Sequence, residues 1–463
     1  MMNRIYLLPL ILLVTGCVND DRVEKTKGID ISKEYPQYWE YRETPILLLG
    51  GSDEDNLFQM AGVEEQLDLL SSAGGNYIRN TMSSRDSGNV WAFEKDPVTG
   101  LYDLDGWNEA YWNRFHRLLE LSSERGIIVQ VEIWATFDFY RDNWLKNPFN
   151  PACNVNYSAE RTGLPERVDS HPTWCENPFF WSIPAQLNNM PVLAYQQRFV
   201  DKLLSYSLQY DHVLYCIDNE TSVTADWGRC WSEYIRKKAL EKGKRIHVTE
   251  MWDPHDLDHI SHRETFDHPE IYSFVEISQN NHQRGENQWN NGIRQIERLR
   301  RSGSLRPVNN VKTYGSWRGR HGGGTHNGIE SFIRSVFFGS AAVRFHRPAT
   351  GLGLGDTARA VIHSMRMATD SIAFFEAAPH NELLGERQVN EAYCRAIPGK
   401  EYLVYFTGAG EVKLDVQSPA GQFIIYRLDI LSGRWSDEST PSAGNTLSLH
   451  SNQKHLLYLI KKE

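Results

Sequence analysis

Three polar residues that directly follow an apolar run are the strongest candidates for chemistry. Residues 213–217 are apolar or aromatic, with Cys216 among them, and Asp218, Asn219 and Glu220 follow. An apolar run of this length is typical of a parallel strand that is covered on both faces. In barrels of parallel strands the catalytic groups lie at the carboxyl ends of the strands. We therefore interpret Glu220 as a catalytic carboxylate, with Asn219 beside it.

Polar and aromatic residues end the other apolar runs as well, and together they indicate a sugar site. Amides and carboxylates hydrogen-bond sugar hydroxyls, while aromatic side chains cover the apolar face of a sugar ring. The residues that we expect to contact the sugar are Arg79, Asn80, Trp134, Asn219, Trp252, Asn280, His282, Tyr314, Arg344 and His346.

Hydrolysis of a glycosidic bond needs a second carboxyl group, because one protonates the leaving oxygen and the other attacks the sugar or activates water. We assign the general acid to Glu220 and expect burial, or the neighbouring Asp218, to raise its pKa. For the second group we favour Glu276, which ends an apolar run before the amide-rich residues 278–282. The alternatives that stay open are Glu250, Asp253 and Glu132.

The elements that must position these residues alternate between short apolar runs and amphipathic helical segments. One such helix is expected over residues 112–125, where Trp112, Phe115 and Leu119 mark one apolar face. Eight such units predict a TIM (β/α)8 barrel over residues 37–380; a doubly wound sheet would want a phosphate-binding fingerprint that is missing here. The eight expected strands are 46–50, 76–80, 127–134, 213–220, 246–252, 271–278, 308–314 and 341–346.

From residue 381 to residue 463 the strand-like segments are short and are separated by Gly, Pro, Ser and Asn. This texture predicts a small antiparallel β-sandwich. It has no obvious cluster of carboxylates or histidines, so we interpret it as a module that packs against the barrel, with carbohydrate binding as the alternative.

The chain resembles the clan GH-A glycoside hydrolases, whose fourth strand ends in Asn-Glu with the Glu as acid/base. Asn219-Glu220 matches that motif, and the resemblance implies that Asn219 contacts the hydroxyl beside the reacting carbon. Arg79 is similar to the clan's second-strand Arg, which supports the nucleophile. The whole chain also resembles polysaccharide-degrading lipoproteins of Bacteroidota, including relatives of apiosidases and proteins described as collagen-binding.

The seventh expected strand departs from this pattern. The clan's nucleophile is a Glu that ends this strand, but here the strand reads NNVKTYG and has no carboxylate. Two other functions therefore stay open. One is a glycan-binding protein without activity. The other is a metal-dependent hydrolase, since His255 and His259 have the spacing of two ligands on one helical face. Our own expectation is no metal and no cofactor.

Basic residues gather near the ends of the seventh and eighth expected strands. They predict an anionic sugar, uronate or sulfated, that is held by arginine side chains, unless they pair with carboxylates inside the barrel. We also expect exo action, because the long stretch 140–188 could close a cleft into a pocket. The basic residues are Lys312, Arg318, Arg320, His321, Arg344, His346 and Arg347.

The amino terminus predicts export and lipidation. Residues 1–16 carry one arginine and an apolar run too short for a good membrane span, and small residues precede Cys17. We expect a signal peptide over 1–16, a lipid on Cys17, a polar tether over 17–36, and a periplasmic or cell-surface location. Export also permits a disulfide between Cys153 and Cys175.

The net charge of −10 makes the chain a poor general binder of nucleic acid. The expected partners are a carbohydrate substrate and, through the lipid anchor, the membrane. The sequence leaves the oligomeric state open.

Overall fold

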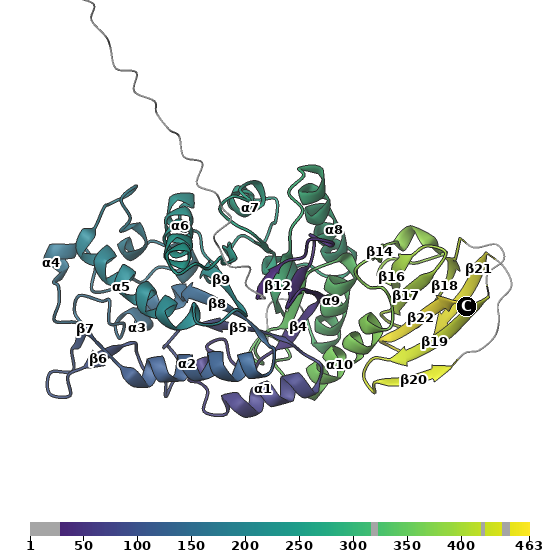
Figure 1. Ribbon diagram of the computed structural model, residues 1–463, viewed down its shortest axis with the longest axis horizontal. Coiled ribbons are helices and arrows are strands. Elements are labelled where there is room, and N and C mark those ends of the chain that lie inside the picture. Colours follow the sequence, from purple (N-terminus) through teal and green to yellow (C-terminus); the bar gives the residue numbers. More distant parts are fainter. Residues whose placement is uncertain (1–27, 316–322, 418–421, 438–444) are drawn as a thin grey trace, which may run out of the picture.

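A computed structural model describes residues 28–315, 323–417, 422–437 and 445–463. Figure 1 shows a barrel of strands and helices with a smaller, yellow β-rich module packed at one end. Among the described residues, no helix is both long enough and apolar enough to cross a membrane.

Eight parallel strands form the barrel, as the sequence predicts, and they follow the order β10-β9-β8-β5-β4-β13-β12-β11. Between β10 and β11, the two ends of this order, Ser273 N donates to the carbonyl of Val248 over 3.0 Å, so the sheet is nearly closed. The strands are β4 (Leu48–Gly51), β5 (Tyr77–Thr81), β8 (Ile128–Trp134), β9 (Val213–Asp218), β10 (Val248–Thr249), β11 (Val275–Glu276), β12 (Val308–Thr313) and β13 (Ala342–Phe345).

Helices cover the outside of the barrel with their apolar faces. In α2, Trp112, Phe115 and Leu119 are buried, and the helix starts where the side chain of Asn108 accepts a hydrogen bond from Ala110 N. The main helices are α1 (Val63–Ser72), α2 (Glu109–Glu124), α5 (Met190–Ser207), α6 (Ala225–Glu241), α7 (Ile260–Asp267), α8 (Gly285–Arg301), α9 (Thr325–Phe338) and α10 (Asp356–Asp370).

The carboxyl-terminal module contains two antiparallel sheets that face each other, as expected for a β-sandwich. Arg395 ties it to the barrel, because its buried guanidinium donates to the carbonyl of Phe337 over 3.0 Å and to Tyr38 Oη over 2.6 Å. One sheet contains β14 (Ala378–Pro379), β16 (Ala392–Ile397), β17 (Glu401–Phe406), β22 (Leu456–Lys462), β19 (Phe423–Asp429) and β20 (Arg434–Asp437). The other contains β15 (Leu384–Gly385), β18 (Gly410–Asp415) and β21 (Thr446–Ser451).

A small antiparallel sheet precedes the barrel, in a region that we partly expected to be a tether. Its strands are β1 (Ile29–Ile31), β2 (Trp39–Tyr41) and β3 (Thr44–Ile46). Ile29 N donates to the carbonyl of Asp211, and the buried indole of Trp39 donates to Asn309 Oδ1 over 3.0 Å. The folded part thus includes residues from 28 onward. The expected signal peptide and Cys17 lie outside the described residues.

The long insertion between β8 and α5 is held by hydrogen bonds, and the disulfide that the sequence permitted there does not form. Cys153 and Cys175 are both free thiols. Asparagine side chains organise the chain instead: Asn150 donates to the carbonyl of Trp144, and Asn177 to that of Phe139. The insertion carries α3 (Arg141–Trp144), α4 (Ala159–Thr162), η4 (Pro172–Trp174) and η5 (Pro178–Trp181).

Candidate functional site

A polar cavity of about 470 Å³ opens at the carboxyl ends of the barrel strands. This is the end of a parallel barrel where catalytic groups gather. The lining residues are Asp55, Arg79, Arg85, Phe137, His171, Thr173, Asn219, Glu220, Asp253, His255, His282, Lys312, Tyr314, His346, Arg347, Ala349 and Thr350.

Glu220 lies in this cavity two residues after the end of β9, and two residues at the end of the seventh barrel strand, β12, hold it. Lys312 Nζ lies 2.8 Å from Glu220 Oε1, and Tyr314 Oη donates to the same oxygen over 3.2 Å. The backbone of Glu220 has a φ of +51°, a left-handed conformation that is uncommon for a residue with a side chain. Such strained residues cluster at functional sites, where the surrounding contacts hold them in place.

The protonation state of Glu220 differs from our expectation. Burial acts to raise its pKa, but Lys312, Arg79 and His346 outweigh burial and lower the pKa to about 2. Glu220 is therefore an ionised carboxylate near neutral pH, and the raised pKa that we expected is wrong. The largest lowering effect comes from Lys312 in β12, the strand on which the resemblance implied a carboxylate.

The side chain of Asn219 is held in place by two cationic side chains. Its Oδ1 accepts from Lys312 Nζ over 2.6 Å and from Arg79 over 2.9 Å. Arg79 in turn binds Glu132 over 2.5 Å and Asp55 over 2.7 Å. Both donors occupy Oδ1, so the amide nitrogen of Asn219 keeps a fixed orientation.

Asp55 is the central anion of this network, and the sequence did not single it out. It lies in the loop after β4, and four positive or titratable groups surround it: Arg79 at 2.7 Å, Arg347 at 3.2 Å, His346 at 3.3 Å and Arg85 at 3.6 Å. Burial acts to raise its pKa, but these neighbours lower the pKa well below the usual range. The one available signal was its position just beyond the first strand of a barrel.

Asp253 is a second carboxylate of the cavity, and its pKa moves in the opposite direction from that of Glu220. Burial and the charge of Glu220 raise the pKa of Asp253, while a hydrogen bond with Thr173 and the neighbouring His255 and Lys312 oppose the rise. A pair of acids whose environments displace their pKa values in opposite directions is the usual signature of divided acid and base roles.

Glu276, our favoured second carboxylate, does not line the cavity. It is 1% exposed, and it accepts hydrogen bonds from the hydroxyl and the backbone N–H of Ser278. Burial raises its pKa to about 7. The two other candidates are also below the cavity: Glu250 accepts from Asp218 N over 2.9 Å, and Glu132 binds Arg79.

Half of the residues that we expected to contact a sugar line the cavity and half do not. Those that line it are Arg79, Asn219, His282, Tyr314 and His346. Those that do not are Asn80, Trp134, Trp252, Asn280 and Arg344. The second set lies at strand ends too, but these side chains serve the packing of the protein. Asn80, for instance, accepts from Phe58 N over 3.0 Å, and Asn280 donates to the carbonyl of Gln288 over 3.0 Å.

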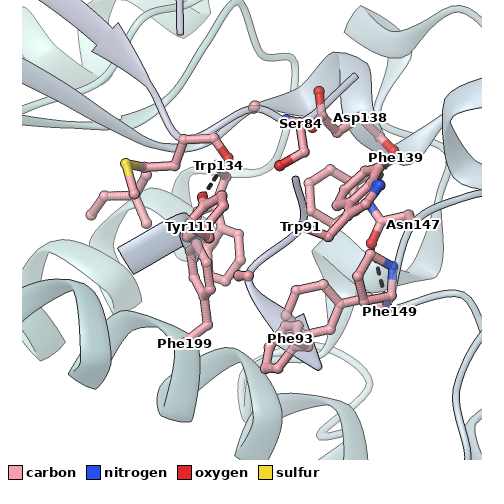
Figure 2. Close-up of a pocket in the computed structure, with 15 residues that line it drawn as sticks. Ser84, Trp91, Phe93, Tyr111, Trp134, Asp138, Phe139, Asn147, Phe149 and Phe199 are labelled. Atoms are coloured by element: carbon pink, nitrogen blue, oxygen red, sulfur yellow. Dashed lines mark hydrogen bonds between the residues drawn. The ribbon is translucent and has the colours of Figure 1, made fainter. Parts of the chain in front are cut away.

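Trp134 belongs to a separate apolar cavity of about 30 Å³. Figure 2 shows it there with Phe93, Phe149 and Phe199, and with Asp138 on the rim of the group. The indole packs edge-on against Phe179 and Trp231 as well. The tryptophan that ends the third barrel strand therefore forms part of an aromatic core.

Aromatic rings form two parts of the polar cavity. On one side His255 stacks on His282 with ring centres 3.5 Å apart, and His282 packs edge-on against Tyr314 at 5.3 Å. On another side Phe137 packs edge-on against His171 at 6.1 Å. Such rings suit the apolar face of a sugar.

The histidine-rich stretch after β10 does not place His255 and His259 on one helical face, the arrangement on which the alternative of a metal-dependent hydrolase depended. The helix α7 begins only at Ile260, and His259 caps it by accepting from Ser261 N over 3.2 Å. His255 lies before the helix. Among the residues that the structure describes, no group of three or more His, Cys, Asp or Glu side chains could hold a metal ion.

The basic cluster is divided by the structure. Arg318, Arg320 and His321 lie outside the described residues. Arg344 is buried below the cavity, where it donates to the carbonyl of Val311 over 2.9 Å and to Ser52. Lys312, His346 and Arg347 line the cavity but each faces Glu220 or Asp55.

Comparison with protein-family models found no match, and comparison with curated protein sequences found none. Comparison with solved structures found a glycoside hydrolase family 5 protein from Bacteroides vulgatus, at 13% identity over 94% of this chain and 93% of that chain, with a TM-score of 0.62. A structure described as a glycoside hydrolase is 12% identical over 94% and 97%, with a TM-score of 0.63. A maltogenic α-amylase from Thermotoga neapolitana is 10% identical over 90% and 99%, with a TM-score of 0.51.

At such low identities these likenesses show the fold alone. The chain has the fold of these glycoside hydrolases over most of its length. Because one barrel fold supports many chemistries, the reaction has to be argued from the cavity.

Proposed function

We propose that this protein is a glycoside hydrolase that binds the end of a saccharide in the polar cavity and cleaves its terminal glycosidic bond. The observation that carries the proposal is the pair Glu220 and Asp253, which line one cavity and have pKa values displaced in opposite directions. Two such carboxyl groups are what glycoside hydrolysis requires.

The direction of each pKa matches one role. Asp253, whose pKa is raised, is the group that protonates the leaving glycosidic oxygen. Glu220 is ionised, and Lys312 and Tyr314 fix its Oε1, which leaves Oε2 to attack the anomeric carbon or to take a proton from water. Asn219, oriented by Arg79 and Lys312, then offers its amide nitrogen to a sugar hydroxyl.

Two features support finer parts of this proposal. His171 and Thr173, from the long insertion, wall one side of the cavity, which favours exo action on a chain end. Arg85 and Arg347 both line the cavity, where their side chains are 12% and 26% exposed. They could hold the carboxylate of a uronate or a sulfate group, so both acidic and neutral sugars belong in the substrate panel.

The test begins with the release of reducing sugar from neutral and acidic plant and algal polysaccharides. Aryl glycosides of the active sugar then separate the roles. Asp253→Asn should lose roughly 10²- to 10⁴-fold in kcat on a poor leaving group and far less on dinitrophenolate, which needs no proton. Glu220→Gln should lose activity on both, and NMR of the first product distinguishes attack on the sugar from activation of water.

Glu276→Gln is the matched control, because it removes the carboxylate that the sequence favoured. We expect near-normal activity from it. A loss of roughly 10²- to 10⁴-fold in Glu276→Gln on a poor leaving group, with full activity in Asp253→Asn, would return the second role to Glu276.

The second candidate function is glycan binding without hydrolysis. The observation in its favour is the 2.8 Å ion pair between Lys312 and Glu220. The resembled clan has its nucleophile on the seventh strand, whereas here that strand carries a lysine that pairs with Glu220. This function predicts calorimetric affinity for oligosaccharides from the same panel with no release of reducing sugar.

For the location, we propose lipidation of Cys17 and attachment to the outer membrane or cell surface. Cys17→Ala should move the protein from the membrane fraction to the soluble periplasmic fraction, as followed by immunoblotting. Wild-type protein in the soluble fraction would contradict the anchor.

A further inference from the structure

An exposed tryptophan lies at the rim of the polar cavity. The side chain of Trp174 is 64% exposed, although large aromatic residues are usually well covered. Its ring centre lies 6.0 Å from that of His171, and His171 lies 6.1 Å from Phe137. His171 and Phe137 both line the cavity, so the exposed Trp174 neighbours a ring of the cavity wall.

The turn that carries Trp174 is fixed on both sides. Before it, His171 caps the short helix η4 (Pro172–Trp174), and its Nδ1 lies 2.8 Å from Thr173 Oγ1. After it, Cys175 adopts a φ of +52°, and its buried Sγ lies 3.2 Å from Thr221 Oγ1. Thr221 directly follows Glu220 in the chain, so the turn is bound to the strand end that carries this carboxylate.

Thr173 also brings the turn close to the other carboxylate, because it lines the same cavity as Asp253 and acts to lower the pKa of that group. The exposed indole therefore belongs to a turn with a fixed backbone, and residues of this turn lie next to both carboxylate-bearing strand ends. An aromatic side chain that is held in place binds a sugar ring with little loss of conformational entropy.

We propose that Trp174 is a stacking platform for the second sugar ring of the substrate, on the leaving-group side of the scissile bond. The side is assigned from Thr173, the residue before Trp174, because it neighbours Asp253, the proposed acid for the leaving oxygen. The ligand class is an oligosaccharide of at least two pyranose units, whose apolar ring face covers the indole. This inference rests on the proposed function for the assignment of the two sides.

The test measures binding, and it does not need turnover. Isothermal titration would use the full chain and xylo-, manno-, cello- and galacturono-oligosaccharides of one to six units. The wild type should gain affinity from one unit to two or three. Trp174→Ala should bind oligosaccharides of two or more units about tenfold more weakly than the wild type and should keep its affinity for the single unit. Trp174→Phe should keep most of the gain, because it retains a ring.

Leu187→Ala is the matched control, because Leu187 is 57% exposed in the same insertion and does not line the cavity. It should bind every oligosaccharide like the wild type. The proposal is overturned if Trp174→Ala binds long and short sugars like the wild type, if it weakens them equally, or if no sugar gains affinity with length in the wild type.

The platform and the hydrolase can fail separately. Length-dependent affinity that needs Trp174, without any release of reducing sugar, would retain the binding surface and refute the hydrolase. Hydrolysis with a gain in affinity that is independent of Trp174 would do the reverse.

Discussion

Two carboxylates of the cavity, Asp55 and Glu220, and two of the barrel interior, Glu250 and Glu276, are all largely buried, yet their pKa values move in opposite directions. Asp55 and Glu220 each contact cations from other strands or loops, and the pKa of each is lowered. Glu250 and Glu276 contact backbone N–H groups and a hydroxyl, and burial raises the pKa of each to about 7. The comparison teaches that burial alone does not set protonation; a cation from elsewhere in the fold decides it.

The largest expected effect comes from removing the central anion of the charged region. Asp55→Asn leaves Arg79 buried with only Glu132 as a charged partner and Arg347 without its nearest one. Breaking a buried ion pair on one side costs about 3–5 kcal/mol, and we expect that loss in the free energy of unfolding measured with urea.

The control for this variant is the surface pair Arg359–Asp356, in which the aspartate side chain is 95% exposed. Asp356→Asn should leave the urea midpoint unchanged. An equally unchanged midpoint for Asp55→Asn would mean that the cations of the cavity do not need this anion.

The barrel interior should respond to pH in its own direction. The pKa of Glu276 rises from 4.5 to about 7 on folding, so the unfolded chain releases the proton first as pH rises. The contribution of this raised pKa to the free energy of unfolding is fully present below pH 4.5. It falls by about 3 kcal/mol as pH rises to about 7. Glu276→Gln should remove this decline. In urea unfolding, the stability of the variant relative to the wild type should therefore be higher at pH 8 than at pH 5.

Glu220→Gln sharpens this test, because the folded pKa of Glu220 lies below its usual value. Its contribution is present above pH 4.5 and is lost as pH falls toward 2, so the difference from the wild type should stay constant between pH 5 and pH 8. Parallel curves for the wild type and Glu276→Gln over that window would refute a raised pKa for Glu276.

The smallest effect should come from making a cavity carboxylate resemble an interior one. Lys312→Met removes the nearest cation from Glu220, so burial then dominates and the pKa of Glu220 should rise by at least one unit, about 1.4 kcal/mol. Carbon-13 NMR titration of the carboxyl group measures it directly. Lys312→Arg retains the positive charge and should keep the pKa low; a rise of equal size in both variants would point to lost geometry instead of lost charge.

The barrel could be predicted because its information is local. Each expected strand contains or overlaps one observed strand, and apolar runs such as 213–217 become strands because both of their faces are buried. The Asn219-Glu220 position followed from the same logic. Asp55 and Thr173 could not be found in this way, because they come from loops that the barrel brings to the cavity.

Side-chain partners were the part that local reasoning missed. The absence of a carboxylate from the seventh strand was visible, but the approach of Lys312 to Glu220, 92 positions away, was not. Likewise Trp134 and Trp252 end strands as Tyr314 does, yet Tyr314 faces the cavity and Trp134 joins an aromatic core.

The sequence by itself determined the eight strand–helix units, the β-sandwich and the strand end at which Glu220 lies. The reason is that the spacing of apolar residues along the chain indicates which face of each element is buried. Only the tertiary structure decided which carboxylates are charged, which aromatic rings face the cavity and which cysteines stay apart. These depend on distances between residues far apart in the chain, and the packing of the barrel together with its loops sets those distances.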